Sequence, residues 1–147
     1  MDLTVRVKKL NKNAVLPRYG TEFSAGADLY ACLDEPATIL PGETVLIHTG
    51  ICIELPAGTV GLVYARSGLA LKQGLAPANK VGVIDADYRG ELMVALYNQS
   101  DSARTVQSGD RIAQLVVTPF YSAAFEEAEE LSDTVRGMGG FGSTGIK

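Results

Sequence analysis

Three β-type runs follow one another in the stretch Thr44-Val45-Leu46-Ile47-His48-Thr49-Gly50-Ile51-Cys52-Ile53-Glu54-Leu55-Pro56-Ala57-Gly58-Thr59-Val60-Gly61-Leu62-Val63-Tyr64-Ala65. The runs are Thr44–Thr49, Ile51–Leu55 and Val60–Ala65, and they are rich in β-branched and apolar residues. Glycine and proline separate them, and short apolar runs bounded by such residues are typical of β-strands. The stretch therefore predicts three strands and an all-β fold.

The same pattern continues on both sides of this stretch. Turn signals such as Pro41-Gly42, Asp87–Gly90 and Ser108-Gly109-Asp110 lie between the runs. Many short strands at regular spacing predict a jelly-roll-like β-barrel or sandwich. One segment, Ser67–Gln73, has a helical character, and it is about two turns long. The other predicted strands are 3–10, 26–31, 37–40, 80–84, 91–98, 104–106 and 112–121.

The composition limits the function classes. The chain has 147 residues, of which 46% are hydrophobic and 20% are charged, so it is long enough for one globular domain with its own core. Its net charge of −4 disfavours binding to nucleic acid or to an anionic membrane. A small anionic ligand is compatible with this charge, provided that local arginines form its site.

Targeting and redox signals are few. The N-terminus lacks the pattern of a signal peptide, and no apolar run approaches the roughly 18 residues of a membrane span, so we expect a cytoplasmic protein, with the nucleus or an organelle as alternatives. Cys32 and Cys52 have no metal-ligand spacing and are interpreted as small buried residues in a reducing compartment. His48 lies in a strand-like run and is interpreted as structural.

The C-terminal segment differs from the rest. An acidic run at 126–130 marks the predicted boundary between a β domain, residues 1–125, and a tail, residues 126–147. The tail holds five glycines from Gly137 to Gly145, together with Arg136 and Phe141. One interpretation is a passive disordered terminus. The alternative is a flexible segment that closes over a ligand with phosphate groups and a flat face, because a guanidinium grips phosphate and a ring stacks.

Four other segments place polar side chains in turns. Ala25–Ala31 has a carboxylate at the start of a strand, and Ala65–Ala70 ends a strand with Arg-Ser-Gly before the short helix, which favours an anion site. Gly82–Gly90 holds Asp85 and Asp87, followed by an aromatic residue and an arginine. Gly109–Leu115 is a glycine turn that leads into a strand. Each segment alone is compatible with ordinary turn caps and hairpins.

Taken together with the tail, these segments resemble the homotrimeric dUTPases in order and spacing. The resemblance runs from Ala25 to Gly145, and the segments Gly82–Gly90 and Arg136–Gly145 are its strongest parts. Ala65 departs from the family, which more often has proline before Arg-Ser. The related dCTP deaminases share the jelly roll, but their catalytic-glutamate pattern is missing here. A P-loop is ruled out, since Gly145 is not followed by Lys-Ser or Lys-Thr.

The resemblance implies hydrolysis of dUTP to dUMP and pyrophosphate, by attack of water on the α-phosphorus with Mg²⁺ on the triphosphate. This activity limits uracil incorporation into DNA and supplies dUMP for dTMP synthesis. Asp85 matches the residue that activates the water, although it also has the alternative of a turn cap. Tyr88 matches the ring that packs under the deoxyribose, and Asn79 matches a side chain that reads uracil. Asp28 matches a carboxylate that reaches the metal through water.

The remaining implied contacts bind the phosphates and close the site. The resemblance also implies a homotrimer in which each site takes residues from three subunits. Two further hypotheses stay open: a jelly-roll binding protein that has lost turnover, and an enzyme that acts on dCTP as well as dUTP. The implied substrate-binding residues are Arg66, Ser67, Gly68 and Gln114 from the domain and Arg136, Phe141, Gly142, Ser143 and Thr144 from the tail.

Overall fold

The computed structural model describes residues 3–140, and most of its regular structure is β-strand. One short helix interrupts the strands, as the sequence predicts. The elements in chain order are β1 (Arg6–Lys9), β2 (Arg18–Tyr19), β3 (Ala27–Tyr30), β4 (Ala37–Ile39), β5 (Thr44–Glu54), β6 (Thr59–Tyr64), α1 (Ser67–Gln73), β7 (Leu75–Pro77), β8 (Val81–Ile84), β9 (Glu91–Asn98), β10 (Arg104–Val106) and β11 (Arg111–Pro119).

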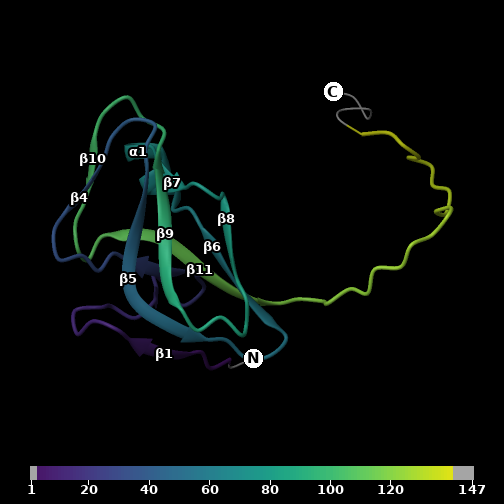
Figure 1. The fold of residues 1–147 in the computed structure, drawn as a ribbon, viewed down its shortest axis with the longest axis horizontal. Helices are drawn as coiled ribbons and strands as arrows, with labels where there is room; N and C mark the ends of the chain where they lie inside the picture. Colours follow the sequence, from purple (N-terminus) through teal and green to yellow (C-terminus); the bar gives the residue numbers. More distant parts are fainter. Residues whose placement is uncertain (1–2, 141–147) are drawn as a thin grey trace.

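The strands form two large antiparallel sheets and one small one (Figure 1). The first sheet has the order β1-β5-β9-β7 and the second has the order β2-β3-β11-β6-β8, while β10 pairs with β4 alone. Among the described residues the sheets do not close into a barrel. The prediction of an all-β, jelly-roll-like fold is confirmed in its sandwich form.

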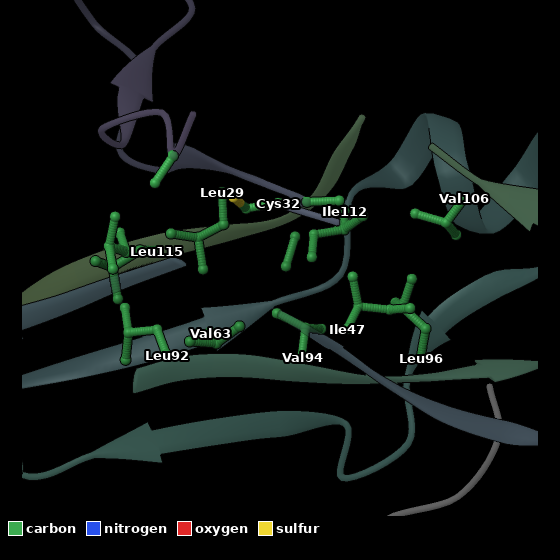
Figure 2. Packing of buried hydrophobic residues seen from close by; sticks show 14 of the residues in the cluster. Leu29, Cys32, Ile47, Val63, Leu92, Val94, Leu96, Val106, Ile112 and Leu115 are labelled. Carbon is green, nitrogen blue, oxygen red and sulfur yellow. The ribbon is translucent and has the colours of Figure 1, made fainter. Parts of the chain in front are cut away.

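Alternation along the strands builds the core between the sheets. In β9 the buried positions are Leu92, Val94, Leu96 and Asn98, every second residue, because successive side chains of a strand point to opposite faces. Figure 2 shows side chains from both large sheets meeting in this core. The core residues that lie in strands and are labelled in Figure 2 are Leu29, Ile47, Val63, Leu92, Val94, Leu96, Val106, Ile112 and Leu115.

Strand β5 differs from its prediction. Thr44–Thr49 and Ile51–Leu55 were expected as two strands, but they form a single strand of 11 residues with a register shift between His48 and Cys52. Gly50 lies inside this irregularity with a φ of 68°, and a Cβ there would approach Ala14 and Cys32 to 3.0 Å. Glycine thus bends the strand without ending it, since neighbouring strands continue the ladder on each side.

The sequence did not predict two of the strands, but it predicted the helix correctly. β2 and β7 are only two and three residues long, too short to show a period. The helix occupies Ser67–Gln73 as predicted and ends at Gly74, which has a φ of 68° and donates its N–H to the carbonyl of Ala70.

The cysteines and the histidine match their predictions in part. Cys32 is buried and free, and burial, followed by the charges of Asp34 and Glu91, raises the pKa of its thiol. Cys52 is free but only partly buried, because its position in β5 lies next to the edge strand β1. The exposed side chain of His48 pairs with Glu91, with 2.9 Å between Nδ1 and Oε2.

The last described segment leaves the β sandwich. Strand β11 ends at Pro119, two residues before its predicted end, and the chain then runs away from the sheets (Figure 1, yellow-green to yellow). Its apolar side chains are exposed, including those of Tyr121, Phe125, Leu131 and Met138. No strand or helix forms between residues 120 and 140.

Candidate active site

A cleft of about 390 Å³ lies where β6 ends and α1 begins. Arg66 stands between the two elements with extended backbone angles, φ −93° and ψ 127°, so the chain changes direction at this residue. Ser67 and Gly68 follow in the first turn of the helix. The cleft is lined by Gly20, Ser24, Ala25, Gly26, Asp28, Arg66, Ser67, Gly68, Arg111 and Gln114.

Asp28 holds two arginines at this cleft. Its Oδ1 accepts a hydrogen bond from Nε of Arg66 at 2.7 Å, and its Oδ2 accepts one from Nη1 of Arg111 at 3.3 Å. The side chain of Asp28 is 13% exposed and that of Arg66 is 25% exposed, so this ion pair is largely shielded from water. Because the pair with Asp28 uses one of the five N–H donors of Arg66, the other donors are available to an anion.

Gln114 closes the cleft from β11. It lies beside Asp28 in the register of β11 and β3, and its Nε2 donates to the carbonyl of Ala65 at 2.8 Å. Gly26 lies against this side chain, since a Cβ on Gly26 would come within 3.2 Å of the Cβ of Gln114 and closer still to its amide. The amide of Gln114 therefore fixes the end of β6 just before Arg66. The alanine that departs from the family pattern supplies only its carbonyl here, which a proline would supply equally.

A second group of predicted residues lies along β8 and the turns at its ends. Asn79 is exposed in the turn between β7 and β8, and its Nδ2 would lie 3.4 Å from a Cβ placed on Gly82. Asp85 directly follows β8 and is exposed, and its carbonyl accepts the N–H of Tyr88 at 3.1 Å. The hydroxyl of Tyr88 donates to the carbonyl of Glu91 at 3.0 Å.

The predicted strands 80–84 and 91–98, on the two sides of the turn that holds Asp85, do not pair with each other. β8 pairs with β6 in one large sheet, whereas β9 pairs with β5 and β7 in the other. The segment 85–90 therefore connects the two sheets and does not join paired neighbours. A pattern of two strands around a turn cannot distinguish these arrangements, since both need the same turn residues.

Asp85 and the Arg66 cleft lie at opposite ends of β6. Tyr64 of β6 pairs with Val81, and Gly61 pairs with Ile84. At about 3.3 Å per residue, Gly61 and Tyr64 are roughly 10 Å apart along the strand, and Asp85 and Arg66 lie beyond them in opposite directions. One chain therefore does not bring Asp85 to the cleft of Arg66 and Asp28.

The tail residues were predicted to complete the site. Arg136 is exposed, and its Nε donates to the carbonyl of Gly139 at 2.9 Å, within the tail itself. Phe141, Gly142, Ser143 and Thr144 lie outside the described residues, so their assignments stay predictions.

Sequence reasoning missed Arg111, Ser24 and Gly26 as parts of the cleft. Arg111 appeared only as a member of a glycine turn, yet it lies 3.3 Å from Asp28, which is 83 positions away in the chain. The available signal was its place directly after Gly109-Asp110, at the start of the strand that carries Gln114. Its partner could not be read from local sequence.

The side chains of the cleft would have to be supplemented by other ligands to hold a metal. Within residues 3–140 there is no group of three or more His, Cys, Asp or Glu side chains that could hold a metal ion. Asp28 is the one carboxylate of the cleft, and both of its oxygens already accept bonds from arginines. This donor set fits a cation that keeps its own waters and takes ligands from phosphates, as Mg²⁺ does.

Comparison with known proteins identifies the family. A family model described as dUTPase matches residues 12–145, nearly the whole chain. The chain belongs to the dUTPase family. Family membership assigns it dUTP diphosphatase activity, the hydrolysis of dUTP to dUMP and pyrophosphate.

Similar sequences and similar solved structures also carry the name of this family. The deoxyuridine 5'-triphosphate nucleotidohydrolase of Desulfitobacterium hafniense is 55% identical over 137 residues, which is 92% of this chain and 91% of the relative. That of a Hydrogenobaculum species is 50% identical, over 96% of this chain and 97% of the relative. The dUTPase of Staphylococcus bacteriophage 80alpha, solved with dUPNHPP, matches with a TM-score of 0.89 and 31% identity, covering 97% of this chain and 99% of that chain.

No helix among residues 3–140 is long and apolar enough to cross a membrane. Membership of the dUTPase family agrees with the order of the sequence motifs and with the all-β fold.

Proposed function

We propose that Asp85 is the general base of this dUTPase and activates the water that attacks the α-phosphorus of dUTP. Its carboxylate is exposed, and within residues 3–140 it takes part in no hydrogen bond or ion pair, so it is free to accept a proton. The turn itself is closed by the main-chain bond between Tyr88 and Asp85, which makes the carboxylate unnecessary as a cap. A positioned carboxylate fills such a base role.

The cleft at the end of β6 binds the triphosphate. Arg66 supplies charge, and Ser67 and Gly68 supply a hydroxyl and main-chain N–H groups beside it. Gln114 positions the end of β6 and adds a polar contact. Positive charge held in place before the reaction stabilises the charge that develops on the phosphates. Arg136 of the tail adds a further contact, to the γ-phosphate.

The dUTPase family is generally metal-dependent. We propose that the metal is Mg²⁺ and that Asp28 contacts it through water. Each oxygen of Asp28 accepts one arginine bond and keeps a second lone pair for a water molecule. When bound, Mg²⁺ neutralises phosphate charge and orients the triphosphate. The chain's own part is to hold Asp28 rigidly between Arg66 and Arg111.

The β8 region recognises the nucleoside. Tyr88 packs under the deoxyribose, where a ribose 2′-hydroxyl would collide with the ring. Asn79 and main-chain groups read the uracil edge. The tail, residues 126–147, then closes on the complex, with Phe141 stacked on uracil and with Gly142, Ser143 and Thr144 around the phosphates.

The active site is assembled from different copies of the chain in a homotrimer. The observation that carries this part is the register of β6 and β8, which holds the Arg66 cleft and Asp85 at opposite ends of a strand. In a single chain the Arg66 cleft and Asp85 are too far apart to act on one substrate. In a closed ring of three subunits, the Arg66 cleft of one chain lies beside Asp85 of its neighbour.

Pyrophosphate release from dUTP, UTP, dCTP and dTTP in Mg²⁺ buffer tests this function, with light scattering for the subunit number. We expect turnover selective for dUTP and a mass three times the 15.5 kDa chain. Nucleotide binding without turnover would favour the alternative of a binding protein, and release of uracil products from dCTP would favour dual action. A fully active monomer would contradict shared sites.

A further inference from the structure

The ring of Tyr88 lies against a glycine of its own turn. A Cβ placed on Gly90 would lie 2.9 Å from Cε2 and 2.5 Å from Cζ of this ring, closer than carbon atoms approach. The ring therefore occupies the space that a side chain at position 90 would need. No other described glycine has an aromatic ring so close to its missing Cβ.

The hydroxyl of Tyr88 fixes the ring in this position. It donates to the main-chain carbonyl of Glu91 at 3.0 Å, one residue beyond the glycine. Tyr88 as a whole is 41% exposed, so one side of the ring covers Gly90 and the rest remains open to a ligand. The ring is placed by its own turn.

Glu91, which accepts this bond, is itself anchored. Its Oε1 accepts the N–H of Gly50 at 2.8 Å, and its Oε2 lies 2.9 Å from Nδ1 of His48. These groups belong to the irregular part of β5, so the glutamate fills the gap that the register shift leaves between β5 and β9. The carbonyl under the hydroxyl of Tyr88 is thus held by the sheet.

We propose that Gly90 is a specificity-determining residue: the absence of a side chain there sets the depth of the Tyr88 ring, and with it the discrimination between deoxyribose and ribose. Glu91 is a positioning residue that holds the acceptor of the Tyr88 hydroxyl. This inference rests on the proposed contact between Tyr88 and the sugar.

The physical reason is steric. A wall rejects an added hydroxyl only as long as the wall cannot move. An alanine at position 90 pushes the ring off the turn and breaks its bond to the carbonyl of Glu91, so the ring no longer has one position. We expect the ratio of kcat/KM for dUTP to kcat/KM for UTP to fall about tenfold.

The test is a double-mutant cycle with Gly90→Ala, Tyr88→Ala and both together, measuring this ratio and the melting temperature of each variant. Each single variant should lower the ratio, and the double variant should match Tyr88→Ala, because Gly90 acts only through the ring. A Gly90→Ala enzyme with the ratio of the wild type overturns the proposal, and so does an additional loss in the double variant.

Two further variants separate this effect from a general loss of stability. Gly61→Ala places a Cβ 3.1 Å from Leu115 in the core, so it should lower the melting temperature and leave the ratio unchanged. Tyr88→Phe keeps the ring but loses its bond to Glu91, so it should lower the ratio less than Tyr88→Ala does. If Gly90→Ala does not fold, Tyr88→Phe provides the test in its place. A kcat/KM ratio for Tyr88→Phe equal to that of the wild type would overturn the proposal.

The proposed function fails in a different way. If Tyr88→Ala keeps the ratio of the wild type, Tyr88 does not read the sugar, and both statements are overturned. If Tyr88→Ala lowers the ratio and Gly90→Ala does not, only the role of Gly90 is overturned.

Discussion

The two ends of strand β6 have opposite electrostatic character. At its C-terminal end, Arg66 and Arg111 are paired with Asp28 in a cleft. Next to its N-terminal end, Asp85 is exposed, and within residues 3–140 its carboxylate has no ionic partner. The charges proposed to bind the substrate are therefore fixed by one another before it arrives, while the carboxylate proposed as the base is free.

The largest effect is expected at the free carboxylate. Asp85→Asn should lower kcat by about 10² to 10⁴, because the amide cannot take a proton from water. KM should change little, and stability should not fall, since the side chain is exposed. Steady-state kinetics and thermal melting measure both.

The matched control for this variant is Asp87→Asn, which changes another exposed carboxylate of the same turn. It should retain turnover close to that of the wild type. Equal losses in the two variants would assign Asp85 a general electrostatic role in place of the base role.

In the proposed site, the tail contacts both the triphosphate and the uracil of the substrate. Deleting residues 136–147 should reduce turnover by about 10², because the contacts of Arg136 and of the glycine-rich residues with the transition state are lost. The fold should persist, since β11 ends at Pro119. Circular dichroism checks the fold and pyrophosphate release checks the activity, and a truncated enzyme at the full rate would make the tail a passive terminus.

Mixing two inactive variants tests whether the ends of β6 serve different sites. Asp85→Asn and Arg66→Gln subunits, refolded together at equal amounts, should regain about a quarter of the wild-type activity. A quarter of the sites then combine an intact cleft from one variant with an intact Asp85 from the other.

A complete site within each chain predicts a different outcome of the mixing experiment. If each chain holds a whole site, every site carries one substitution, and the mixture stays as inactive as its components. Refolded wild-type protein provides the reference for recovery.

A smaller effect concerns stability at the paired end. Asp28→Asn should lower the free energy of unfolding by about 1–3 kcal/mol, because the negative charge between two arginines is lost at a largely shielded position and the amide keeps only one oxygen that can accept a hydrogen bond. Denaturant unfolding measures this change. A variant as stable as the wild type would show that the arginines need no partner.

The smallest effect is expected for an exposed ion pair. Arg6 and Glu54 lie 3.0 Å apart, but their side chains are 79% and 44% exposed. Glu54→Gln should cost less than about 1 kcal/mol, since water screens such pairs. A loss as large as that of Asp28→Asn would mean that shielding does not set the strength of these pairs.

Local sequence predicted much of the fold because its signals are local. Ser67–Gln73 is helical as predicted, and Glu91–Asn98 is a strand with the predicted bounds. Thr44–Glu54 was divided at Gly50 because a glycine inside a β-type run normally ends it. Pairing with β1 and β9 on the two sides of Gly50 overrides that local signal.

Local sequence is sufficient for the strand pattern, for the helix and for the motifs that place the chain among the dUTPases. Three features become visible only in the folded chain: Arg111 and Arg66 share Asp28, the ring of Tyr88 lies against Gly90, and Asp85 lies at the end of β6 opposite Arg66. The reason is physical. A strand or a turn follows from preferences within a few residues, whereas register and contact follow from packing between segments that are tens of residues apart.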